Sequence, residues 1–71
     1  MKKNEKAAVD AMDRMEALMS AGEYVAAHAA GVEAAAHLDA VLAARPDNRA
    51  AQECSLLVVK MLAQCAKATA A

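Results

Sequence analysis

The segment AARPDNRAA, residues 43–51, constrains the fold more than any other part of this sequence. It contains Pro46, the only proline of the chain, which disfavours helix at the residue before it and has no N–H to donate. Asp47 and Asn48 follow, and both residue types are common helix N-caps. One helix is therefore predicted to end near Ala44, and another to begin near Asp47 or Asn48.

The residues on both sides of this break favour helix. The chain is rich in Ala, Leu, Met, Glu, Lys and Gln, the residue types that lose least on entering a helix. Tyr24 is the only aromatic residue among 71, so few large side chains are available to fill an interior. A chain of this size removes only about 60% of its unfolded surface from water on folding. The sequence predicts an all-α fold with a thin core.

A second break is predicted at MSAGEY, residues 19–24. Ser20 and Glu23 have the S-x-x-E spacing of a capping box, in which the serine oxygen accepts from the amide of Glu23. The residues on either side of this pair, Met19 and Tyr24, have the spacing of a hydrophobic staple. These two signals predict that a new helix starts here.

The alternative is one long helix over residues 4–44, because a glycine inside a helix costs only about 1 kcal/mol. With the break, the fold is a three-helix unit with helices at about 5–19, 21–44 and 48–69. Without it, the fold is a small helical hairpin with one long arm. In both cases residues 1–71 form a single helical domain, with 1–4 and 70–71 as frayed ends.

The turn also resembles that of a known repeat family. Gly22-Glu23-Tyr24, followed by Ala27, is similar to the turn between the two helices of a tetratricopeptide repeat. The match covers about a dozen residues, and Pro46 comes about two turns later than the closing proline of that family. Ala11 and Arg14 occupy the positions of the family's aromatic residue and leucine. The resemblance therefore implies shared turn chemistry and no repeat array.

The middle helix is expected to pack closely against its neighbours. Ala27, Gly31 and Ala35 recur every four residues, so they line one face of a helix. Because the side chains at a contact set the distance between two helix axes, this small face predicts tight packing within the chain.

One face of the last helix is expected to be buried and carries Ala50, Cys54, Leu57, Val58, Met61, Cys65 and Ala68. Apolar residues extend around most of the remaining circumference, with Glu53, Lys60, Gln64 and Lys67 as the polar stripe. Such a helix needs partners on several sides, so the sequence predicts a dimeric helical bundle. The first helix carries a methionine stripe that is typical of a core but can also form an adaptable partner surface. The predicted self-association or partner interface comprises Leu56, Leu57, Val59, Met61 and Leu62 of the last helix and Met12, Met15 and Met19 of the first.

The cysteines and the N-terminal sequence favour a reducing compartment. Cys54 and Cys65 are eleven residues apart in one predicted helix, about 16 Å along its axis, which is too far for a disulfide within the chain. Both are expected to be buried thiols. Asp10 and Asp13 interrupt any apolar region of a signal peptide, and charges recur too often for a membrane-spanning helix. The predicted location is the cytoplasm.

No catalytic, cofactor-binding or metal-binding set is predicted. His28 and His37 lie about 13 Å apart along a helix and on opposite sides of it, so they cannot share a metal ion. Glu33 and His37, four residues apart, are expected to form a solvent-facing hydrogen-bonded pair. The net charge is −1 and the basic residues are scattered, which argues against nucleic-acid binding.

These observations predict a non-enzymatic protein–protein interaction module without a small-molecule substrate. As a homodimer, it would act as an adaptor, inhibitor or antagonist of a larger protein partner, and its size and build resemble those of small regulators encoded by phages or mobile elements. One alternative is a co-chaperone of the secretion-system type. The other is a helical-hairpin dimer, similar to Rop, that grips RNA through its helix faces.

Overall fold

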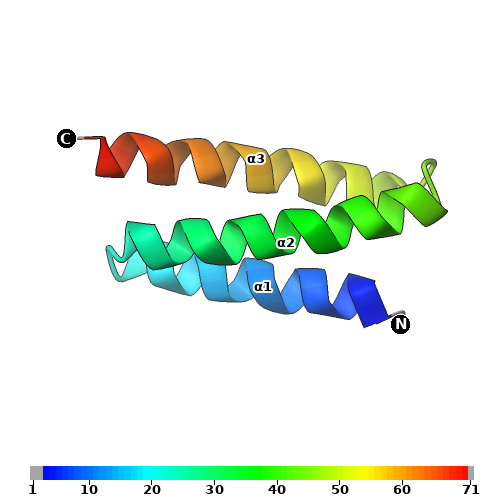
Figure 1. The fold of residues 1–71 in the computed structure, drawn as a ribbon, viewed down its shortest axis with the longest axis horizontal. Coiled ribbons are helices and arrows are strands. Elements are labelled where there is room, and N and C mark those ends of the chain that lie inside the picture. Colours follow the sequence, from blue (N-terminus) through cyan, green and yellow to red (C-terminus); the bar gives the residue numbers. More distant parts are fainter. Residues whose placement is uncertain (1–2, 71) are drawn as a thin grey trace.

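The computed structural model describes residues 3–70, which form three α-helices (Figure 1). They are α1 (Lys3–Ser20), α2 (Tyr24–Ala44) and α3 (Arg49–Thr69), so the predicted all-α, three-helix unit is confirmed. The chain reverses direction at each of the two turns, so α2 is antiparallel to α1 and α3 (Figure 1). Lys3 and Asn4, which we expected to be frayed, belong to α1. The other expected frayed residues at 1, 2 and 71 lie outside the described residues.

The break between α1 and α2 is confirmed, but its mechanism differs from the predicted capping box. Ser20 is the last residue of α1, and Glu23 precedes α2 without a side-chain cap hydrogen bond. The chain instead makes a Schellman motif, in which Glu23 N–H donates to Leu18 O at 2.9 Å and Gly22 N–H donates to Met19 O at 3.0 Å. Gly22 has φ +78°, the left-handed conformation that this motif requires. The glycine therefore ends α1, and no serine cap starts α2.

The break between α2 and α3 follows the prediction closely. Asn48 N–H donates to Arg45 O at 3.1 Å, which closes a β-turn with Pro46 at its second position. The side chain of Asn48 is the N-cap of α3, because its Oδ1 accepts from Ala51 N–H at 3.1 Å. The turn is reinforced by Gln52, whose Nε2 donates to Pro46 O at 2.6 Å.

α2 is the central helix and packs against α1 on one side and against α3 on the other, whereas α1 and α3 approach each other at few places. Its contact residues are small, as predicted: Ala27 and Gly31 are buried and Ala35 is half-buried. A Cβ atom on Gly31 would lie 2.6 Å from Leu62 Cδ2 and 2.7 Å from Met15 Cε. The glycine thus leaves the space in which side chains of α1 and α3 meet over α2.

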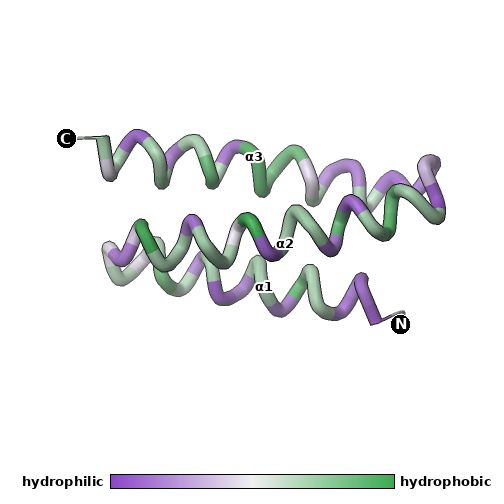
Figure 2. The backbone as a smooth tube through the Cα atoms, viewed as in Figure 1, coloured by the Kyte–Doolittle hydropathy of each residue, from purple (hydrophilic) through white to green (hydrophobic). Residues whose placement is uncertain are grey.

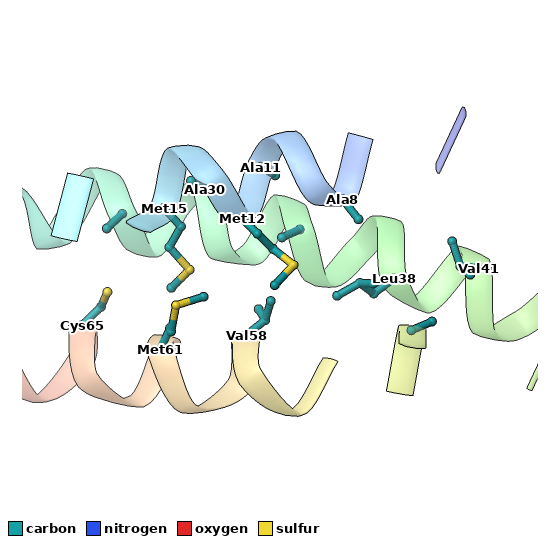
Figure 3. Close-up of a cluster of buried hydrophobic side chains, with 13 residues drawn as sticks. Ala8, Ala11, Met12, Met15, Ala30, Leu38, Val41, Val58, Met61 and Cys65 are labelled. Carbon is teal, nitrogen blue, oxygen red and sulfur yellow. The ribbon is translucent and has the colours of Figure 1, made fainter. Parts of the chain in front are cut away.

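The core consists of alanines, methionines and a few branched side chains. Figure 3 shows Met12 and Met15 of α1 directed toward Val58 and Met61 of α3, across the surface of α2. Met15, Val58 and Cys65 are the largest side chains that are fully buried, and no polar side chain of residues 3–70 is buried. The core is therefore thin and entirely apolar, which is what the scarcity of large residues predicts.

Polar contacts on the surface connect α1 to α2. Arg14 Nη2 of α1 bonds Glu33 Oε2 of α2 at 2.9 Å, and Asn4 Oδ1 lies 3.4 Å from His37 Nδ1. The predicted pair between Glu33 and His37 is thus corrected, because each of these side chains turns to α1. Both lie on the side of α2 that faces α1, where partners from α1 are within reach.

Candidate interaction surfaces

The predicted interface residues occupy three different environments. Met12 and Met15 of α1 and Met61 of α3 are buried together in the core of the single chain. Met19 and Leu62 are half-buried and pack against that core. The surface available to a partner is therefore provided by the remaining residues of the predicted set, which are Leu56, Leu57 and Val59 of α3.

The rotation of α3 differs from the sequence prediction. We expected Leu57 to lie on the buried face, but 44% of its surface is exposed. The buried residues of α3 are Ala51, Val58, Met61 and Cys65, which follow one another at intervals of seven, three and four residues. The sequence does not reveal which face of α3 is buried, because the helix is apolar around most of its circumference and several rotations would each bury an apolar face.

A continuous apolar stripe runs along the exposed side of α3. We call it the outer stripe, and it comprises Leu56, Val59, Ala63 and Ala66. The intervals of three and four residues keep its members on one face of the helix. Leu56 is 66% exposed and Val59 is 59% exposed, although both side chains are branched and apolar. The outer stripe has the residue spacing with which one helix packs against another.

A groove lies between α1 and α3, where these two helices do not close over α2. We call it the α1–α3 groove, and its volume is about 240 Å³. It is lined by Glu5, Ala8, Val9 and Met12 of α1, Leu38 and Val41 of α2, and Asn48, Ala50, Ala51 and Cys54 of α3 and its cap. Core side chains of α2 thus form its floor, so the groove is apolar. At the one polar end of the groove, Asn48 Nδ2 donates a hydrogen bond to Glu5 Oε1 at 3.4 Å and so links the cap of α3 to α1.

Three valines are exposed that the sequence did not identify as surface residues. Val9 lines the α1–α3 groove, while Val25 and Val32 lie on α2 and are 76% and 52% exposed. Val25 and Val32 are seven residues apart, as are the buried Ala27 and Ala34, so a two-sided heptad pattern in α2 is the signal that could have revealed them. Figure 2 shows α2 as hydrophobic along most of its length, with hydrophilic residues only at intervals.

The cysteines and histidines of the described residues are spread over α3 and α2. No group of three or more His, Cys, Asp or Glu side chains in residues 3–70 lies close enough to hold a metal ion. Cys65 is a buried free thiol, and Cys54 is a half-buried free thiol at the edge of the α1–α3 groove. His28 and His37 are on separate parts of α2, and His37 is near Asn4.

None of the helices in the described part of the chain has the length and apolar character needed to cross a membrane. Comparison with known proteins adds no relative: no family model, curated protein or solved structure matches this chain.

Proposed function

We propose that this protein is a non-enzymatic protein–protein interaction module that works as a homodimer in the cytoplasm. In this role it acts as an adaptor or inhibitor of a larger protein. The observation that carries the proposal is the outer stripe of α3, with Leu56 and Val59 mostly exposed in the single chain. The free thiols Cys54 and Cys65 suit a reducing compartment.

The outer stripe supports self-association because exposed branched side chains gain free energy when they leave water. Each Å² of apolar surface removed from water contributes about 25 cal/mol. A stable interface typically covers about 800 Å² on each partner. This corresponds to roughly a sixth of the 4675 Å² surface of the described chain, so the interface would extend from the outer stripe onto neighbouring exposed residues.

The α1–α3 groove supports binding of a second kind of protein. It lies on the side of α3 away from the outer stripe, so it stays open when two copies pair through that stripe. Its floor and walls are apolar, and Glu5 stands at one end. The fitting ligand is an amphipathic helix with apolar anchors and a basic residue that reaches Glu5.

Self-association is tested by measuring mass. Sedimentation equilibrium at tens of micromolar should give twice the chain mass, whereas Leu56→Asp or Val59→Asp should give the monomer with unchanged helix content. Gln64→Asp adds the same charge to an exposed position on another side of α3 and should leave the dimer intact. A wild-type protein that remains monomeric at these concentrations would overturn the proposal.

Partner binding is tested with a groove variant in the dimeric protein. Val9→Asp places a charge on the groove wall at an exposed position, so folding should persist while capture of the partner from the host is lost. Gln64→Asp, which adds the same charge at an exposed position outside the groove, is the matched control. Capture of RNA that nuclease treatment abolishes would support the RNA-gripping dimer instead, and capture of a secreted protein would support the co-chaperone.

A further inference from the structure

We propose that the two copies pair through antiparallel α3 helices, related by a two-fold axis close to Lys60. This inference rests on the proposed homodimer and specifies its orientation. The starting observation is a line of charged residues beside the outer stripe, formed by Glu53, Lys60 and Lys67. They recur every seven residues, so they lie along one edge of the stripe, and all three are exposed.

The charges on this edge favour an antiparallel pair. In such a pair each edge faces the same edge of the second copy, and positions equally far from the axis meet. With the axis at Lys60, Glu53 of one copy meets Lys67 of the other, and this happens twice. In a parallel pair the edge faces the opposite edge of the stripe, which carries Ser55, Leu62 and Thr69 and offers no charge. Only the antiparallel arrangement forms ion pairs.

Glu53 and Lys67 are available for this pairing. Among residues 3–70, Arg14 and Glu33 form the only ion pair, so neither Glu53 nor Lys67 has an ion-pair partner inside the chain. The arrangement brings one like pair together, since Lys60 meets its own copy at the axis. That repulsion is small because Lys60 is exposed and a long lysine side chain extends its charge into water.

The sizes of the side chains in the outer stripe favour the same orientation. The two large residues, Leu56 and Val59, come first along α3, and the two small ones, Ala63 and Ala66, follow. An antiparallel pair centred at Lys60 sets Leu56 against the space between Ala63 and Ala66 of the second copy. A parallel pair would instead set leucine against leucine and alanine against alanine. Large residues facing small ones fill the seam, whereas the parallel order leaves a void at the alanine end.

The test uses two charge-reversal variants and their mixture. Glu53→Lys alone and Lys67→Glu alone each replace two attractive pairs with two repulsive ones. We expect each to raise the dimer dissociation constant about tenfold, as the summed loss of several weak exposed ion pairs would. Mixed in equal amounts, the two variants restore both attractive pairs in the heterodimer. The chain carrying both substitutions restores them in its homodimer and should bind about as tightly as the wild type.

The readout is native mass spectrometry of the mixture, with one variant isotopically labelled. Heterodimer well above the one half expected from random pairing supports the antiparallel seam, and the preference should fade at about 1 M salt. Glu16→Lys, on α1 and away from the seam, is the matched control and should pair randomly with the wild type. If the wild type is dimeric but the two reversal variants pair randomly, the antiparallel orientation is wrong and the homodimer itself is still supported. A monomeric wild type would overturn both.

Discussion

Replacing Gly22 by alanine isolates the cost of the turn between α1 and α2. Gly22 has φ +78°, and no atom lies within 4 Å of the place that a Cβ would occupy. A substitution therefore meets no steric obstacle from other residues. An L-residue in the left-handed region costs about 1–2 kcal/mol, and the lower entropy of the unfolded alanine chain returns about 0.4–1 kcal/mol. We expect Gly22→Ala to lower the free energy of unfolding by about 1 kcal/mol.

The measurement is urea unfolding followed by circular dichroism, with every variant at one protein concentration because association affects apparent stability. The melting temperature should fall by about 4–8 °C, the shift expected for 1 kcal/mol in a domain of this size. Gly22→Asn should lose less, since asparagine tolerates the left-handed region better. D-alanine at this position, introduced by chemical synthesis, favours positive φ and should stabilise the protein.

Ser20→Ala separates the two mechanisms proposed for the same turn. A capping box would make this change cost about 1 kcal/mol. In the structure Ser20 is the last residue of α1 and Glu23 has no side-chain partner in the turn, so the change should be neutral or slightly stabilising. A Gly22→Ala variant more stable than the wild type would mean that α1 continues into α2. If Ser20→Ala lowers the free energy of unfolding by about 1 kcal/mol, the capping box forms after all.

Two further predictions concern α3. Asn48→Ala removes the acceptor for Ala51 N–H and should cost about 1 kcal/mol in urea titrations, whereas Asp47→Ala, one residue earlier and exposed, should change stability by less than about 0.5 kcal/mol. Cys54 should react with a thiol reagent faster than Cys65 under native conditions, because Cys54 is half-buried at the α1–α3 groove and Cys65 is fully buried. Equal rates would mean that the buried face of α3 opens, and a ligand in the groove should protect Cys54.

Helix content and the position of both turns could be predicted from the sequence because local chemistry determines them. Pro46 and Asn48 act within a few residues of themselves, so their effects on chain direction and capping do not depend on the rest of the fold. The mechanism of the first turn was missed because MSAGEY contains two competing signals. The conformational freedom of Gly22 prevailed, since the Schellman motif satisfies two backbone N–H groups at once.

The surface of α3 could be predicted only in part. Leu56 and Val59 are exposed as expected of a partner surface, but Leu57 was assigned to the wrong face. Amphipathic periodicity identifies a buried face only when the opposite face is polar, and α3 has too few polar residues for that. Its rotation is instead fixed by how Val58 and Met61 fit against the methionines of α1. Such packing depends on residues more than forty positions away.

The thin core and the exposed outer stripe have one common cause. An alanine-rich chain can bring three helices close together, but close helices leave little volume for large side chains, and only Met15, Val58 and Cys65 among the larger residues are fully buried. A core of this kind in a domain below about 80 residues seldom contributes more than about 3–5 kcal/mol of net stability. Leu56 and Val59 point away from that core, so they can add to stability only through a second chain. Pairing through the outer stripe would therefore stabilise α3 itself as well as join two copies. The α1–α3 groove, which α3 helps to form, would then be more firmly held in the dimer than in the single chain.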